Sequence, residues 1–351
     1  MSDPAAGNTP RRTGLGLLPI PKVFLEIYVQ EEVFLALIGL GFFAVGMTYE
    51  NASIARWVGF SLAAYAAVAN DSIQTIGTYI ASNQQKPWWW LWLFIGGLFI
   101  ATTFYSFHTY GGDVSYERLS AKGFSEAPTD FSFLQVAAPL FLLILTRLKM
   151  PVSTTFLLLT SFSTSTSGVS KVLWKSVSGY FLAFGLAFVV WMLLSKLLDR
   201  WFRGEAHPLW RIAQWGTTGS LWCVWMMQDA ANIAVYLPRK MSLIEYGAFA
   251  AVIFFGLGLL FKSGGDKIQE IVTEKKNVVD VRSATIIDAV YAVILFYFKL
   301  HSKVPMSTTW VFIGLLAGRE IAIQLRVGEA AGWRAAVRLM FKDILLVTIG
   351  L

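Results

Sequence analysis

A short polar phrase, Pro-x-Ser-Thr-Thr, occurs once in each half of the chain, at 151–155 and 305–309, between long apolar stretches. Serine and threonine hydroxyls donate hydrogen bonds, and the first turn of a helix carries free backbone N–H groups. Because proline is tolerated at the first position of a helix, we expect each phrase to begin a helix whose N-terminus faces an anion. The candidate anion-binding residues are Ser153, Thr154, Thr155, Ser307, Thr308 and Thr309.

A second pair of motifs precedes these phrases, Asn70-Asp71-Ser72-Ile73-Gln74 and Gln228-Asp229-Ala230-Ala231-Asn232. A carboxylate at the centre of a bilayer costs roughly 2.5–3.5 kcal/mol, so each aspartate needs a compensating partner. Sodium, a coupling proton or the hydroxyl of a protonated phosphate would each supply one. The candidate cation-coupling residues are Asn70, Asp71, Asp229 and Asn232, and Asp71, Asp229, Gln74 and Gln228 are also candidate substrate ligands.

Each motif also has a structural interpretation. Serine and threonine pack closely between membrane helices and bond to backbone carbonyls, and a buried aspartate can hold a neighbouring helix. The recurrence of the same phrase at matching places in both halves favours one binding site built from two parts.

Composition indicates a membrane protein. Hydrophobic residues make up 56% of the 351 residues and charged residues 15%, and the mean hydropathy is +0.57. The single cysteine, Cys223, excludes an intrachain disulfide framework. The formal net charge is +7, but the basic residues lie between apolar segments, which suits membrane topology better than a nucleic-acid partner.

Apolar segments predict an all-α polytopic fold with about 10–11 transmembrane segments. They fall at about 32–49, 54–80, 88–107, 130–147, 150–168, 174–198, 211–237, 243–261, 283–299 and 304–318, with a weaker stretch at 335–351. Lysine and arginine are enriched in alternate loops, which predicts a multi-pass protein of the plasma (inner) membrane with a cytoplasmic N-terminus. If each Ser-Thr-Thr segment crosses the membrane, residues 54–198 make five crossings, and the second half is inverted relative to the first.

This count predicts two inverted-topology repeats with broken helices at the midplane. The predicted organisation is a cytoplasmic tail at 1–30, an additional transmembrane helix at 31–53, a first repeat at 54–198, an inter-repeat loop at 199–210 and a second repeat at 211–351.

These motifs resemble those of a known family. Asn70-Asp71 followed by Gly77-Thr78, together with both Pro-x-Ser-Thr-Thr strings, resembles the hallmarks of the inorganic phosphate transporter (PiT) family over about residues 54–335. The resemblance implies an inverted-repeat fold, phosphate uptake coupled to sodium or protons, and often a homodimer. It places ten residues at or near the substrate and cation sites: Asn70, Asp71, Ser153, Thr154, Thr155, Asp229, Asn232, Ser307, Thr308 and Thr309.

The chain departs from the family pattern at several positions. Val68 replaces a glycine, Gln74 and Gln228 each replace an asparagine, and Phe156 and Trp310 replace the histidine that follows Ser-Thr-Thr. These changes keep both carboxylates but alter the size of the cavity, so sulfate is the nearest alternative substrate.

The sequence thus predicts a secondary active transporter of inorganic phosphate, with ion-coupled symport by alternating access. Sulfate or another oxyanion is the alternative substrate, and a non-transporting accessory protein or an enzyme is the alternative of a different class. No phosphate-cradling loop and no His-Glu-x-x-His string occurs, so neither an enzyme nor a cofactor is predicted. The expected partners are phosphate, a coupling cation, membrane lipid and a second copy of the chain.

Overall fold

The computed structural model describes residues 32–120, 123–148, 152–193, 204–264 and 280–327, and four single positions at 337, 338, 341 and 345. The chain divides into two compact units, residues 1–43 and 44–351. In the first unit the description starts with helix α2 (Glu32–Thr48), within the segment predicted at 31–53. The tail predicted at 1–30 lies outside the described residues.

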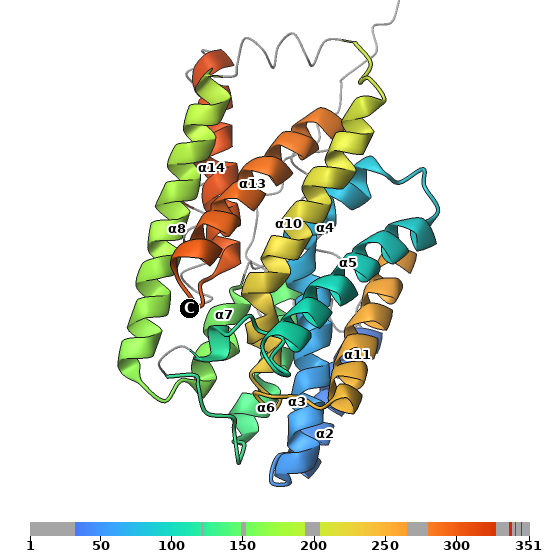
Figure 1. Cartoon of the computed structure of the whole chain (residues 1–351), viewed down its shortest axis with the longest axis vertical. Helices are drawn as coiled ribbons and strands as arrows, with labels where there is room; N and C mark the ends of the chain where they lie inside the picture. The colour runs from blue at the N-terminus through green and yellow to red at the C-terminus, as the bar shows by residue number, and fades with distance from the viewer. Residues whose placement is uncertain are drawn as a thin grey trace, which may run out of the picture. The chain divides into compact units, whose positions relative to one another are not determined.

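The second unit is built from helices, and its described part contains no strand. The first half contains α3 (Ala52–Ala66), the π-helical turn η1 (Ala67–Asp71), α4 (Ser72–Ser82), α5 (Trp88–Thr109), the 3-10 turn η2 (Arg118–Ser120), α6 (Phe133–Arg147), α7 (Thr154–Leu157), the 3-10 turn η3 (Leu159–Phe162) and α8 (Thr166–Leu193). The second half contains α10 (Leu209–Ala234), α11 (Leu243–Lys262), α13 (Val281–His301) and α14 (Thr308–Val327), as Figure 1 shows.

Several helices are suited to lipid. Five helical segments of the described chain are long and apolar enough to cross a membrane: Ala52–Asp71, Trp88–Thr109, Thr166–Leu193, Leu243–Lys262 and Val281–His301. Large apolar side chains such as Trp174, Phe181 and Leu259 are exposed on their surfaces. Because lipid replaces water around such side chains, the prediction of an all-α polytopic membrane protein is confirmed.

The first Ser-Thr-Thr motif lies at the turn of a re-entrant hairpin, which we name hairpin 1 (133–162). Near its base, Gln135 Nε2 donates to Ser161 O at 3.0 Å, and the rings of Phe131 and Phe162 are 6.1 Å apart. The chain therefore enters through α6, turns at the motif and returns through α7 and η3 to the end where it started.

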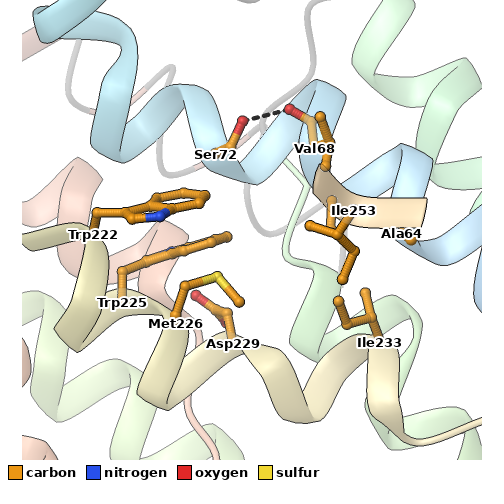
Figure 2. A pocket seen from close by; sticks show the side chains of 10 residues that line it. Ala64, Val68, Ser72, Trp222, Trp225, Met226, Asp229, Ile233 and Ile253 are labelled. Carbon is orange, nitrogen blue, oxygen red and sulfur yellow. Dashed lines mark hydrogen bonds between the residues drawn. The ribbon is translucent and has the colours of Figure 1, made fainter. Parts of the chain in front are cut away.

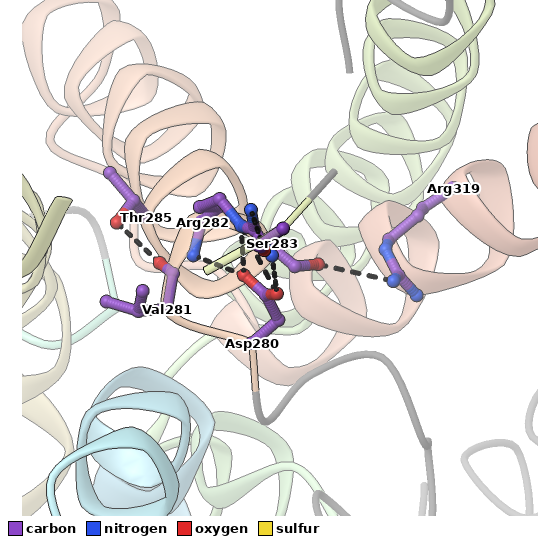
Figure 3. Close-up of polar contacts among 7 residues, drawn as sticks. Asp280, Val281, Arg282, Ser283, Thr285 and Arg319 are labelled. Atoms are coloured by element: carbon purple, nitrogen blue, oxygen red, sulfur yellow. Dashed lines mark hydrogen bonds and ion pairs between the residues drawn. The ribbon is translucent and has the colours of Figure 1, made fainter. Parts of the chain in front are cut away.

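The second motif lies at the turn of hairpin 2 (281–327), formed by α13 and α14. Near its base, Arg319 Nη2 donates to Ser283 Oγ at 3.3 Å, as Figure 3 shows. Closer to the turn, the rings of Tyr291 and Phe312 are 5.6 Å apart. The two arms thus lie side by side.

The two hairpins enter from opposite ends of α10, which has 26 residues and is therefore about 39 Å long. At its C-terminal end, Tyr236 Oη donates to Gln135 O in hairpin 1 at 2.8 Å. At its N-terminal end, Thr285 Oγ1 of hairpin 2 donates to Trp210 O at 3.5 Å. The inverted arrangement predicted from the sequence is therefore present.

The route to that prediction needs one correction, because the Ser-Thr-Thr segment of hairpin 1 returns to the end where α6 started, whereas α13 of hairpin 2 is long and apolar enough to cross a membrane. Hydropathy records the length of an apolar segment but not its direction, and the polar motif turns the chain back. In the described first half, the α3–α4 segment, α5 and α8 remain as crossings. The number of crossings in the first half is again odd, so the second half remains inverted relative to the first. The repeat boundaries at 54–198 and 211–351 stay predictions.

Small residues bring α14 of hairpin 2 close to α8. A Cβ atom at Gly314 would overlap the carbonyl oxygen of Tyr180, and one at Gly318 would overlap that of Phe184. Both clashes are with backbone atoms, which cannot move aside as a side chain can. The two glycines therefore set the distance between these helices, as small residues do in membrane bundles.

The start of α13 is fixed by a capped ion pair at the base of hairpin 2 (Figure 3). Asp280 Oδ1 accepts from Arg282 N at 2.8 Å, and the two side chains form an ion pair of 2.6 Å. Arg282 Nη1 also donates to Gly204 O at 3.1 Å, just before α10. The hydrogen bonds from Arg282 lower the pKa of Asp280 below its ordinary value.

Candidate functional site

The first half-site forms where η1 meets α4. A π-helical turn inserts one extra residue into a helix and often accompanies a functional site. It ends at Asp71, whose Oδ1 accepts from Asn70 Nδ2 at 2.8 Å and whose Oδ2 accepts from Thr154 Oγ1 in hairpin 1. Asn70 Nδ2 also donates to Val152 O at 3.4 Å, so the carboxylate and the hairpin turn are held together.

The second half-site repeats this pattern on α10. Asp229 Oδ1 accepts from Asn232 Nδ2 at 2.6 Å, and Asp229 Oδ2 accepts from Thr308 Oγ1 in hairpin 2 at 2.6 Å. Trp225 Nε1 donates to Thr308 Oγ1 at 3.3 Å, and Tyr291 Oη donates to Thr308 O at 2.9 Å. In both half-sites, an aspartate accepts one bond from a nearby asparagine and one from the first threonine of Ser-Thr-Thr.

The serine of each motif caps a helix. Ser153 Oγ accepts from Phe156 N, and Ser307 Oγ accepts from Trp310 N, both at 3.3 Å. The helix predicted to start at Pro305 therefore begins at Thr308, because Ser307 has taken the N-cap position. Pro151, at the matching place, lies outside the described residues.

The two hairpin turns meet across the pseudo-symmetric centre. Thr155 Oγ1 donates to Met306 O at 3.1 Å, and Gln74 Nε2 donates to Thr309 Oγ1 at 3.0 Å. The rings of Phe156 and Trp310, which replace the family's histidines, are 5.8 Å apart.

Most of the sequence-predicted site residues come together here and are buried. The exposed fraction is 6% or less for Asn70, Asp71, Ser153, Thr154, Thr155, Gln228, Asp229, Asn232, Ser307, Thr308 and Thr309. Asp71 and Asp229 lie within electrostatic reach of each other. Two carboxylates this close in an apolar environment need compensating positive charge.

The two glutamines occupy different positions. Gln74 bridges the half-sites, whereas Gln228 Nε2 donates to Leu295 O in α13 at 2.9 Å and so points to a neighbouring helix. The amide oxygens of both side chains are buried with no donor among the described residues. A buried carbonyl oxygen without a donor is a ligand that a cation or a protonated oxyanion can use.

Sequence reasoning missed two basic residues beside the second half-site. Arg118 in η2 is 2% exposed, and its Nε donates to Met227 O at 2.7 Å, two residues before Asp229. Its Nη1 donates to Ser302 O at 3.3 Å and to Val304 O at 3.4 Å, and Lys175 Nζ donates to the same two oxygens. No periodic pattern marks Arg118, because it lies in a loop.

A third buried carboxylate was also missed. Asp288 in α13 is 1% exposed, and its two oxygens accept from Thr78 Oγ1 at 2.9 Å and Thr218 Oγ1 at 2.5 Å. It ties hairpin 2 to α4 and α10. The signal was available, since an aspartate inside the apolar segment 283–299 needs a partner.

A small cavity of about 20 Å³ reaches Asp229 from the side of α11 (Figure 2). Its lining is mainly apolar and includes Met226, Ile253 and the stacked rings of Trp222 and Trp225, whose centroids are 5.0 Å apart. None of the six Ser-Thr-Thr hydroxyl residues lines it. Of the predicted site residues, Asp229 alone lines this cavity.

Comparisons with known proteins support the fold. No protein-family model matches the chain, and no curated protein matches it in sequence. A solved structure described as "The sodium-dependent phosphate transporter" matches with a TM-score of 0.57 and 16% sequence identity, covering 84% of this chain and 96% of the matched chain. In the described residues, no cluster of three or more His, Cys, Asp or Glu side chains could hold a metal ion. The chain shares the fold of the matched structure.

Proposed function

We propose that the protein is a secondary transporter that carries inorganic phosphate across a membrane together with sodium or protons. The observation that carries this proposal is the pair of Asp–Thr contacts, Asp71 with Thr154 and Asp229 with Thr308. The fold of a structure named as a sodium-dependent phosphate transporter supports the same substrate and favours sodium.

In the proposed cycle, the anion replaces contacts that now join the two half-sites. Each threonine hydroxyl that points at a carboxylate can instead donate to a phosphate oxygen when a cation neutralises that carboxylate. Substrate and coupling cation thus bind together, because either one alone leaves a buried charge uncompensated. The ten residues that the family resemblance singles out act here as ligands of the anion and of the cation.

Alternating access follows from the opposite entry of the hairpins. Movement of hairpin 1 would open the site toward one end of α10, and movement of hairpin 2 would open it toward the other. The contacts from Thr155 to Met306 and from Gln74 to Thr309 would break in turn. We place the protein in the plasma (inner) membrane with a cytoplasmic N-terminus, as a homodimer.

Selectivity for phosphate over sulfate rests on a proton. Phosphate near neutral pH carries a hydroxyl that can donate to a carboxylate, whereas sulfate carries none and would meet only repulsion. Asp71, Asp229 and the free amide oxygen of Gln74 are the acceptors for that hydroxyl.

The identity of the substrate is tested by uptake of labelled phosphate into proteoliposomes that hold the purified chain, with and without excess unlabelled sulfate. We expect phosphate uptake that sulfate does not compete away. Asp71→Asn should abolish it, and Asp130→Asn, a change of an exposed loop carboxylate, should leave it intact. Uptake of sulfate in place of phosphate would make the protein a sulfate permease, and uptake of neither would favour a non-transporting relative.

A further inference from the structure

The two half-sites match in their aspartate, asparagine and threonine contacts but differ in charge. Arg118 lies within electrostatic reach of the Asp229 carboxylate and is bonded to Met227 in the same turn of α10. Asp71 accepts hydrogen bonds from Asn70 and Thr154, which are both neutral. Among the described residues, the only charged group that acts on Asp71 is Asp229.

The arginine is built into the second half-site. It is buried, and its hydrogen bonds join the turn before Asp229 to the turn of hairpin 2 at Ser302 and Val304. Burial lowers the pKa of Arg118 to about 10, and Asp229 opposes this change, so the guanidinium stays charged near neutral pH. Lys175 binds the same two carbonyl oxygens of hairpin 2.

No other described acidic side chain offers Arg118 a charge partner. The adjacent Glu117 forms its ion pair with Lys303 at 2.5 Å, on the exposed surface. A buried guanidinium bonded only to carbonyl oxygens still needs a negative charge nearby. Asp229 is the group that supplies it.

We propose that Arg118 is the fixed counter-charge of Asp229, so that the Asp229 carboxylate is compensated without a bound cation and only the Asp71 half-site requires a mobile one. This inference deepens the proposed function, because it assigns the coupling cation to one of two similar half-sites. The transporter then couples to fewer cations than two equivalent carboxylates would require.

The inference predicts opposite effects of two matched substitutions on the purified full-length protein in sodium-free choline buffer. Asp71→Asn removes an uncompensated carboxylate, so the Tm should rise. Asp229→Asn leaves Arg118 without its counter-charge, so the Tm should fall. Equal shifts in the same direction would overturn the proposal, since they would mean that the half-sites are electrically equivalent.

A double-mutant cycle tests the pair itself. Arg118→Gln should lower the Tm, and the double variant Arg118→Gln with Asp229→Asn should have a higher Tm than Arg118→Gln alone, because both charges are then absent. Arg118→Lys keeps the charge and should be milder. Additive effects of the two single changes would contradict an electrostatic coupling between Arg118 and Asp229.

Sodium provides a readout that a purely structural arginine would not change. Sodium that binds only the folded state raises the Tm, and the slope of Tm against the logarithm of sodium concentration grows with the number of ions bound. The dependence of Tm on the logarithm of sodium concentration should be about twice as steep in Arg118→Gln as in the wild type, as two carboxylates then need sodium. In Asp71→Asn the dependence should vanish.

The matched control is Arg239→Gln. Arg239 is a half-buried loop arginine, bonded to the carbonyl oxygens of Phe124 and Glu126 in the loop before hairpin 1. Its loss should lower the Tm without changing the sodium dependence. A change in Arg239→Gln equal to that in Arg118→Gln would overturn the assignment.

These Tm measurements do not depend on transport of phosphate. If they follow the expected pattern while proteoliposomes take up no phosphate, the proposed substrate fails and the charge assignment stands. If phosphate uptake is robust while the cycle is additive and the sodium dependence unchanged in Arg118→Gln, the charge assignment alone fails.

Discussion

At the scale of single residues, the proposed site depends on a threonine hydroxyl that donates to an aspartate and, in the proposed cycle, donates to the anion instead. Thr154 and Thr308 each donate to an aspartate in the same half-site, and each is buried. A hydrogen bond to a charged group contributes about 1.5–3 kcal/mol, and a hydroxyl lost next to a buried carboxylate leaves that charge poorly solvated. The hydroxyl is therefore more important than the shape of the side chain.

Replacing this hydroxyl should reduce transport. We expect Thr154→Val, which keeps the shape, to lower the initial rate of phosphate uptake roughly ten- to a hundredfold, in line with the loss of one bond to a charged group. Thr154→Ser keeps the hydroxyl and should retain most activity. Thr308→Val and Thr308→Ser provide the same comparison in the second half-site. Equal rates in Val and Ser variants would show that the hydroxyl has no role in transport.

Much of the site could be predicted residue by residue, because a carboxylate or a repeated hydroxyl phrase in apolar sequence is a strong local signal. Asp71, Asp229 and both Ser-Thr-Thr motifs come together as expected. Gln228 differs, since its position on α10 directs the amide to Leu295, which spacing along the chain does not reveal. Arg118 was missed because its contacts, with Met227 and Val304, are distant in sequence.

At the scale of elements, hairpin 2 packs closely against α8 because Gly314 and Gly318 have no side chains to hold the two backbones apart. Dispersion between closely approaching backbones replaces the hydrophobic effect as the force that holds helices together in lipid. The glycines therefore set how closely hairpin 2 approaches α8.

A methyl group at this interface should separate the helices. Gly318→Ala places a Cβ against the carbonyl oxygen of Phe184, so we expect a lower Tm and slower uptake. Gly185→Ala is the matched control, because a Cβ there meets nothing within 4 Å. Its Tm should equal or exceed that of the wild type, since alanine favours helix over glycine. A similar loss in both variants would contradict the packing argument.

The base of hairpin 2 carries a pH-dependent contact. Arg282 lowers the folded-state pKa of Asp280, so the ion pair stabilises the fold above the unfolded pKa of an aspartate and is lost as the pH falls through the lower folded value. Asp280→Asn keeps an acceptor for the helix cap but removes the charge.

In that variant, the Tm should fall less than in the wild type when the pH is lowered from neutral into the acidic range. Thermal unfolding followed at several pH values measures the difference between the two proteins. Parallel curves for wild type and Asp280→Asn would show that the ion pair contributes no pH-dependent stability.

The elements themselves were partly predictable. Apolar length located the helices, and the segments at 88–107 and 243–261 correspond to α5 and α11. The direction of the chain at each motif was not predictable from apolar length. Hairpins form because Ser153 and Ser307 cap helices that restart inside the unit, and this depends on packing against α10 and α8.

At the scale of the whole second unit, two hairpins that enter from opposite ends meet at one buried site. The odd number of crossings in the first half produces this inversion, and in the proposed cycle each end of α10 then has its own moving hairpin. Charge breaks the symmetry, because Arg118 accompanies Asp229 while no described basic side chain acts on Asp71. The arrangement predicts a transporter with two similar gates and a cation requirement concentrated in one half.

The most direct test of ion-coupled phosphate transport measures phosphate accumulation in proteoliposomes. One set carries an imposed sodium gradient at equal pH on both sides, and the other carries a proton gradient in choline buffer. We predict accumulation above the external concentration only with an inward sodium gradient, decay when the gradient is dissipated, and no accumulation in Asp71→Asn. Accumulation driven by protons alone would keep the site and change the coupling ion. Uptake that only equilibrates, whichever gradient is applied, would contradict an ion-coupled transporter.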